Sequence, residues 1–73
     1  MTYWVNVDFL TATCTIHREH CPFIIREETL GKGIGRYKHD GGWFEFGTLE
    51  EAESFCRKEK RCHKIRYCER CFY

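Results

Sequence analysis

The sequence predicts a single small domain of the α+β class, stapled by a zinc ion. Three observations lead to this prediction. The chain of 73 residues has room for one domain, which spans 1–73. It contains alternating hydrophobic runs typical of strands and one capped amphipathic segment typical of a helix. It also holds six cysteines, and chains this short often need disulfides or a metal to supplement a modest core.

The N-terminal segment predicts a β-hairpin. In residues 3–9 the odd-numbered positions are Tyr, Val, Val and Phe, and the positions between them are mostly polar. Residues 12–17 alternate in the same way, with Cys14 on the apolar face. A period of two is the pattern of a strand with one buried face. We therefore expect two antiparallel strands that turn near Leu10.

The stretch CPFIIREETLGKG, residues 21–33, supports two interpretations. Pro22 is suited to begin a short helix and Gly31 to end one. The apolar residues FII at 23–25 are equally suited to a short strand. Both assignments stay open.

A second β-hairpin is expected after this stretch. Residues 40–42 are Asp-Gly-Gly, a sequence that suits a tight turn with positive φ. Tyr37 precedes the turn and the aromatic-rich WFEF, residues 43–46, follows it. The pattern indicates a strand on each side of the turn.

The segment from Leu49 to about Lys60 is predicted to be the one helix. Thr48 and Glu51 form a capping box, and acidic residues fill the first turns while basic residues fill the last. The apolar stripe consists of Leu49, Ala52, Phe55 and Cys56. After the helix, HKIRY at 63–67 is interpreted as a short strand that leads to the C-terminal cysteines.

The C-terminal sequence CERC, residues 68–71, predicts a zinc knuckle. Zinc takes four ligands, usually thiolate sulfur or imidazole nitrogen, in a tetrahedron. Cys68 and Cys71 supply two, since a C-x2-C turn aims both sulfurs at one point. His17, the last residue of the second strand, and Cys21, four residues on across a turn, supply the other two. The predicted centre holds one structural Zn²⁺ and ties the first hairpin to the C-terminal segment.

Other uses of the cysteines and histidines remain open. His20 is an alternative to His17, although its adjacency to Cys21 makes convergence on one ion difficult. Cys14 and Cys56 fit the apolar faces of their elements and are expected to be core residues. The six cysteines can also form three disulfides. A second metal site is a further option, from His39, Cys56, Cys62 and His63.

These motifs together resemble the Ada-type metal-binding domain, the zinc domain of the Ada DNA-repair protein and of small relatives appended to competence proteins and nucleases. The matching pieces occur in the family order: IHREHC at 16–21, WFEF at 43–46, TLEEA at 48–52 and CERC at 68–71. The resemblance implies zinc held by the four residues above in a small α+β fold. It also implies an association with DNA-related proteins.

The chain departs from the family pattern at two places. In Ada the first residue of the C-x3-C pair is a cysteine that accepts methyl groups from phosphotriesters, and here that position is His17. An imidazole ligand is not an activated thiolate, so the methyl-acceptor reaction is not expected. Residues 53–67 also lengthen the path from the helix to CERC, which puts transfer of a DNA-contact surface in doubt.

The charge distribution predicts a binding role. The net charge is only +1, but the segment 57–70 carries seven basic residues against two glutamates. These residues are the candidate nucleic-acid contacts: Arg57, Lys58, Lys60, Arg61, Lys64, Arg66 and Arg70. Basic residues attract DNA or RNA phosphates, and exposed aromatic rings can stack on bases. The expected function is therefore a structural-zinc module that contacts nucleic acid.

The sequence is also compatible with two other functions. The acidic helix start and the aromatic content of 16% also suit a protein–protein adaptor. A thiol-redox protein is less expected, because a redox C-x2-C typically opens a helix after a strand. Catalysis is not expected, because a zinc ion with four protein ligands has no open position. The sequence shows no secretory signal and no membrane span, so we expect a cytoplasmic protein.

Overall fold

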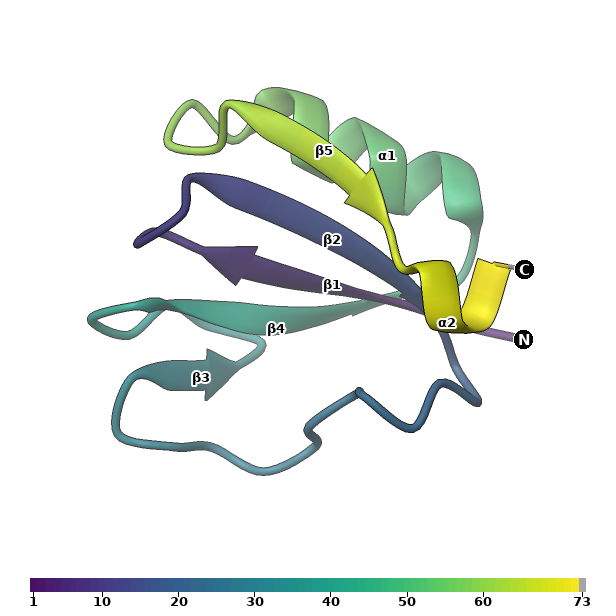
Figure 1. The fold of residues 1–73 in the computed structure, drawn as a ribbon, viewed down its shortest axis with the longest axis horizontal. Coiled ribbons are helices and arrows are strands. Elements are labelled where there is room, and N and C mark those ends of the chain that lie inside the picture. Colours follow the sequence, from purple (N-terminus) through teal and green to yellow (C-terminus); the bar gives the residue numbers. More distant parts are fainter. Residues whose placement is uncertain (73) are drawn as a thin grey trace.

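The computed structural model describes residues 1–72 and has one mixed β-sheet, one main helix and a short C-terminal helix (Figure 1). These elements confirm the small α+β class. Their bounds, in chain order, are β1 Tyr3–Asp8, β2 Thr13–Arg18, β3 Lys32–Ile34, β4 Gly41–Phe46, α1 Leu49–Lys58, β5 Lys64–Tyr67 and α2 Glu69–Phe72. No helix within residues 1–72 has the length and apolar character needed to cross a bilayer.

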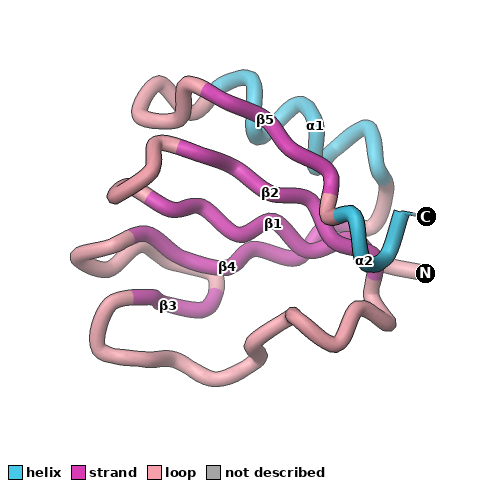
Figure 2. Tube along the Cα trace, viewed as in Figure 1, coloured by secondary structure: helices cyan, strands magenta, loops and turns pink. Residues whose placement is uncertain are grey.

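The sheet has the strand order β3-β4-β1-β2-β5, visible as five neighbouring strands in Figure 2. Strands β1 and β2 pair antiparallel, with Val5 opposite Ile16, which confirms the N-terminal hairpin. Strand β4 pairs antiparallel with the other side of β1. Strand β5 confirms the strand expected at 63–67 and runs parallel to β2 at the edge of the sheet.

The expected second β-hairpin is wrong. Strand β3 lies beside β4 but runs parallel to it, and only one isolated antiparallel bridge, Lys38 to Gly41, occurs at the expected turn. The edge of β4 on which a second strand would pair is occupied by β3, because residues 32–34 pair with residues 41–43. Tyr37 instead packs its ring against Phe9, at a centroid distance of 5.1 Å, and against Phe44, at 4.9 Å.

The stretch 21–33 contains neither the helix nor the FII strand considered for it. Residues 19–31 form a long loop, and only its end enters β3. The loop is held by side-chain contacts, because Glu28 binds Arg36 at 2.5 Å and accepts a hydrogen bond from the Ile34 backbone N–H at 3.0 Å. Ile24 is the loop residue whose side chain is buried with Trp4 and Trp43. These tertiary contacts stabilise the segment in place of the repeating backbone hydrogen bonds of a helix or strand.

Helix α1 covers one face of the sheet. Its N-terminal cap is as predicted, since the Thr48 hydroxyl accepts a hydrogen bond from the Glu51 backbone N–H at 3.1 Å. The helix ends at Lys58, two residues before the expected end, because Glu59 adopts an extended backbone. Apolar residues from β1, β2 and α1 form the buried core on this face: Val5, Val7, Cys14, Ile16, Ala52 and Cys56.

A second buried cluster lies on the opposite face of the sheet. It consists of Trp4, Cys21, Ile24, Trp43 and Cys68. The strand pattern assigned Trp4 to the polar face, and the structure buries it there, under the long loop that follows β2. The two clusters therefore separate the cysteines, with Cys14 and Cys56 under the helix and Cys21 and Cys68 on the other side.

Candidate metal centre

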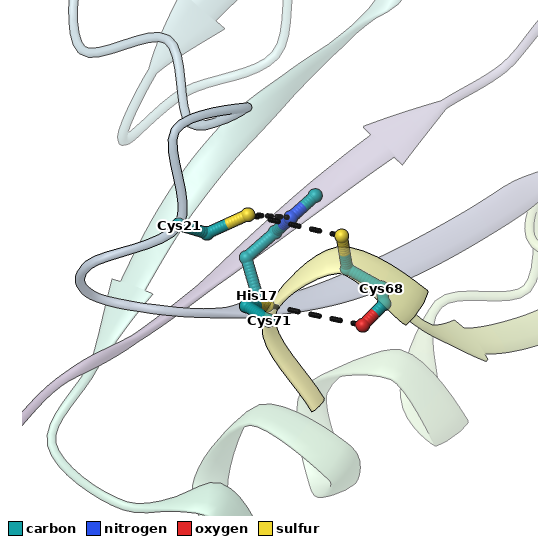
Figure 3. A group of neighbouring side chains, drawn as sticks. All are labelled: His17, Cys21, Cys68 and Cys71. Atoms are coloured by element: carbon teal, nitrogen blue, oxygen red, sulfur yellow. Dashed lines mark hydrogen bonds between the residues drawn. The ribbon is translucent and has the colours of Figure 1, made fainter. Parts of the chain in front are cut away.

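Two segments far apart in the sequence, 17–21 and 68–71, bring His17, Cys21, Cys68 and Cys71 together (Figure 3). His17 is near the end of β2, and Cys21 follows in the turn after that strand. Strand β5 runs parallel to β2 and delivers Cys68 to the same end of the sheet, where Cys71 follows in α2. The four candidate ligand atoms all lie within 4.8 Å of one another. The predicted residues thus form one cluster that can hold a metal ion.

The distances within this cluster fit a tetrahedral ion. Nδ1 of His17 lies 3.4 Å from Sγ of Cys21, and the Cys21 and Cys68 sulfurs are 3.7 Å apart. With zinc–ligand bonds of about 2.0–2.3 Å, the edges of a tetrahedron measure about 3.5–3.8 Å. These two spacings match the tetrahedron, and the remaining pairs of candidate ligand atoms lie within 4.8 Å, so some side chains would move by up to about 1 Å to bind zinc.

Backbone hydrogen bonds hold the ligand-bearing turns in place. The Cys21 N–H donates to the Arg18 carbonyl at 2.9 Å, closing the turn after β2. The Cys68 N–H donates to the Ile16 carbonyl at 2.9 Å, which extends the pairing of β5 with β2. The Arg18 N–H donates to the Cys71 sulfur at 3.2 Å, a contact that stabilises a thiolate. The site is therefore supported by the fold around it.

The chemistry of His17 also fits a metal ligand. Its side chain is buried, and burial lowers its pKa, so the imidazole is neutral, the form that binds metals. Nδ1 faces the Cys21 sulfur, and Nε2 is buried without a hydrogen-bond partner among residues 1–72. The ring packs against Trp43 at a centroid distance of 5.4 Å. A metal ion bound at Nδ1 would hold the ring as the tautomer with its proton on Nε2.

Two of the thiols differ in acidity. Burial raises the pKa of Cys21 to about 11, and hydrogen bonds with the neighbouring thiols add to the effect. Burial also opposes ionisation of Cys68, but the backbone N–H groups of Arg70 and Cys71 outweigh it and lower the pKa. A cation is needed to hold several thiolates in so small a volume. Zn²⁺ with three thiolates and one imidazole carries a net charge of −1.

The alternative ligands do not join this cluster. The His20 side chain is 84% exposed and lies near Glu19, away from the buried ligands. His39 is exposed beside Asp40, and His63 is exposed as well. Within residues 1–72, the cluster of His17, Cys21, Cys68 and Cys71 is the one group with metal-ligand geometry. The proposed second site from His39, Cys56, Cys62 and His63 is therefore not assembled.

The seven basic residues predicted to contact nucleic acid lie in different places. Arg57 and Lys58 end α1, and Lys60 and Arg61 follow in the next turn. Arg61 is bound to Glu59 at 3.0 Å and stacks over Phe9 and Tyr37. Lys64 and Arg66 lie on β5, opposite Thr13 and Thr15 of β2, and Arg70 lies on α2.

A groove on the sheet face beside the metal centre was not predicted. It has a volume of about 440 Å³, and its lining includes Asn6, Thr13, Thr15, Phe23, Arg66 and Arg70, together with the ligands His17 and Cys68. Asp8 also lines it and lies 3.9 Å from the Lys32 ammonium group. The alternating patterns of β1 and β2 already placed Asn6, Asp8, Thr13 and Thr15 on the polar faces of their strands. What the sequence did not reveal was that β5 would extend this face with Arg66.

Comparison with known proteins adds no assignment, since no family model, no curated protein and no solved structure matches the chain.

Proposed function

We propose that the chain is a small module with one structural zinc ion, and that it contacts nucleic acid through the groove beside that ion. The single observation that carries the metal assignment is the cluster of His17, Cys21, Cys68 and Cys71, with spacings of 3.4 and 3.7 Å. The resemblance to the Ada-type domain points the same way. Zinc would bind to these four side chains and cross-link the turn after β2 to the C-terminal segment.

A structural role for zinc follows from the number of donors. Four protein ligands complete a tetrahedron, whereas a catalytic zinc keeps a position for water or substrate. His17, Cys21 and Cys68 are buried, which limits the access of a substrate to the ion. We therefore propose a scaffold and not an enzyme.

The groove supports nucleic acid as the partner. Arg66 and Arg70 provide positive charge beside the acidic Asp8 and Glu69, and the hydroxyls of Thr13 and Thr15 provide hydrogen-bonding groups on the sheet. Phe23 is 58% exposed, so its ring is available to stack on a base. Phosphate contacts from arginine and base stacking on aromatic rings are the usual contacts of single-stranded nucleic acid.

The test is fluorescence anisotropy of the zinc-loaded protein with labelled single-stranded DNA, single-stranded RNA and duplex DNA over a range of salt concentrations. Wild type is compared with the double variant Arg66→Gln/Arg70→Gln, which removes the two basic residues that line the groove. A matched control, Arg57→Gln/Lys58→Gln, removes the same charge from the end of α1. We expect the groove variant to weaken binding about tenfold and to reduce the salt slope by about two, since each phosphate contact contributes about one.

Two results would contradict this proposal. Zinc-loaded protein that binds none of the three probes at 50 mM salt has no nucleic-acid function of this kind. An equal loss of affinity in the α1 control would show that the contact is not made through the groove. Both results leave the metal assignment intact, because that assignment is read from the zinc content.

A protein partner is the second candidate, and one observation favours it. Three apolar side chains of the loop 19–31 are exposed to solvent: Phe23 at 58%, Ile25 at 49% and Leu30 at 100%. Exposed apolar side chains on one segment are typical of protein contact sites. Binding that persists at high salt would favour this candidate, because phosphate contacts weaken steeply as salt rises.

A further inference from the structure

A second group of cysteines lies on the helix side of the sheet, away from the metal centre. The sulfur atoms of Cys14 and Cys62 are 2.6 Å apart, although the residues are 48 positions apart in the sequence. Cys14 is fully buried on β2, and Cys62 is half-buried in the turn before β5. Cys56 belongs to the same core cluster as Cys14. The metal centre uses none of the three.

The spacing suits a covalent bond better than a metal. Two sulfurs at 2.6 Å are closer than unbonded atoms pack, and the separation is about half an ångström above the disulfide length of about 2.05 Å. Two ligands of one zinc ion lie about 3.8 Å apart. Within residues 1–72, Cys14 and Cys62 have no third donor in metal-ligand geometry.

We propose that Cys14 and Cys62 form a reversible disulfide, independent of the metal centre, that fastens the start of β5 to β2. The oxidant is a low-molecular-weight disulfide such as oxidised glutathione. Cys62 is the accessible partner and reacts first, because Cys14 is fully buried and Cys62 is not. This order follows from exposure alone.

The reaction proceeds in two exchanges. The Cys62 thiolate attacks one sulfur of oxidised glutathione, forms a mixed disulfide and releases one glutathione thiolate. The Cys14 thiolate then attacks the Cys62 sulfur, forms the internal disulfide and releases the second glutathione thiolate. The two protons lost by the cysteines are taken up by the two glutathione thiolates. Two electrons pass to glutathione, and reduced glutathione reverses the sequence.

The environment of both thiols makes the reaction slow at neutral pH. Burial raises the pKa of Cys62 to about 12. The hydrogen bond with Cys56, and then burial, raise the pKa of Cys14. Only the thiolate attacks a disulfide, so the rate increases with its concentration. We expect the rate to rise about tenfold per pH unit between pH 7 and pH 9.

The position of the disulfide gives it a structural consequence. Strand β5 is an edge strand of four residues that pairs only with β2. Its first end is held by hydrogen bonds from the His63 and Lys64 N–H groups to the Ala12 carbonyl, at 2.7 and 3.2 Å. Its other end leads to Cys68. A disulfide at Cys62 would fix the first end covalently, as the metal fixes the second.

The test is incubation of the zinc-loaded, fully reduced protein with oxidised glutathione, followed by native mass spectrometry and non-reducing peptide mapping. We expect a mass loss of two hydrogens with zinc retained, and a peptide pair linked through Cys14 and Cys62. Cys62→Ser should abolish this product. Cys56→Ser, the matched control from the same cluster, should retain it. Thermal melting should show the oxidised form about 10 °C more stable than the reduced form, because the bond closes a long loop.

Several outcomes would overturn the proposal. These are the absence of an internal disulfide after prolonged incubation at pH 8.5, a bond from Cys14 to Cys56, and a product that persists in Cys62→Ser. An unchanged melting temperature would refute the fastening of β5. Peptide mapping identifies the linked pair whether or not zinc is present, so the result does not depend on the proposed function. If Cys62→Ser fails to fold, Cys62→Ala serves in its place.

Discussion

The sulfurs of Cys21 and Cys68 lie 3.7 Å apart although the two residues are 47 positions apart in the sequence. Cys21 lies in the turn after β2, and Cys68 lies directly after β5. Strand β5 has a neighbour on one side only, and its four residues are all exposed. An edge strand this short adds little stability by itself, so a metal bound between these sulfurs would order the C-terminal segment.

Removal of the metal is expected to release this segment. A chelator should lower the melting temperature by more than about 10 °C, because metal binding to such a site is coupled to folding. Amide hydrogen exchange should become fast first in β5 and α2, since their contacts depend on the metal ligands. Thermal melting and exchange mass spectrometry, with and without chelator, measure both effects. Unchanged exchange at 64–72 after verified zinc loss would contradict this prediction.

The packing of α1 on the sheet gives a second prediction. The Phe55 ring packs against Phe44 at 4.9 Å and Phe46 at 5.1 Å, centroid to centroid. Phe55→Ala should lower the free energy of unfolding by about 2–3 kcal/mol, since the ring is only partly buried. Leu30→Ala is the control, because Leu30 is 100% exposed and should change stability by less than about 0.5 kcal/mol. Urea unfolding of zinc-loaded protein compares the three; equal midpoints for Phe55→Ala and wild type would be inconsistent with this packing.

Glu59 gives a prediction about pH. Hydrogen bonds from Arg61, at 3.0 Å, and from the Tyr37 hydroxyl, at 2.5 Å, outweigh burial and hold the pKa of the Glu59 carboxyl at about 2. Because this pKa is lower than in the unfolded chain, the ionised carboxyl stabilises the fold at neutral pH. The contribution is lost as the pH falls from about 4.5 toward 2.

Glu59→Gln should therefore reduce the free energy of unfolding by about 1–2 kcal/mol at pH 7, and the difference from wild type should shrink below about pH 4.5. Urea unfolding from pH 7 to pH 3.5 measures the difference. Glu27→Gln at an exposed loop position is the control, with no expected change. A difference that stays constant down to pH 3.5 would refute the ionised contact.

Substitution of two glycines by alanine is expected to destabilise the fold by different amounts. Gly41 has a φ of +126°, and a Cβ there would lie 1.9 Å from the Val7 carbonyl oxygen. Gly41→Ala should cost more than about 3 kcal/mol or abolish folding, because the clash is with backbone. Gly35, with a φ of +69°, has open space around its Cβ position, so Gly35→Ala should cost only about 1 kcal/mol. Thermal melting distinguishes the two, and similar costs would contradict the close approach of β1 and β4.

Most of the elements of the fold could be predicted from local sequence patterns. The alternation in β1 and β2 and the capping box at Thr48 each identified an element from its own residues, and the structure confirms both. The parallel pairing of β3 with β4 could not be predicted from local patterns. Residues 35–40 connect the two strands so that both run in the same direction, and Tyr37 in this connection packs into the core. The loop 19–31 also lacked a local signal, since Glu28 and Arg36 hold it through side chains.

The residues of the candidate metal centre were predictable because their chemistry is specific. A C-x2-C pair and an H-x3-C pair favour a shared metal ion over the other uses of these residues, and the structure brings all four together. The parallel path of β5 beside β2 had no signature in the sequence. The approach of Cys14 to Cys62 depends on that path, so it could not be foreseen from spacing.

The measurement that tests the central claim most directly is native mass spectrometry of protein purified under reducing conditions. We predict one zinc ion per chain in wild type, loss or marked weakening of zinc binding in His17→Ala and Cys68→Ser, and full retention in Cys56→Ser and His20→Ala. The first pair removes ligands, and the second removes a cysteine and a histidine that lie outside the cluster. A wild-type chain without zinc and six hydrogens lighter would contain three disulfides, and the structural-zinc account would be wrong.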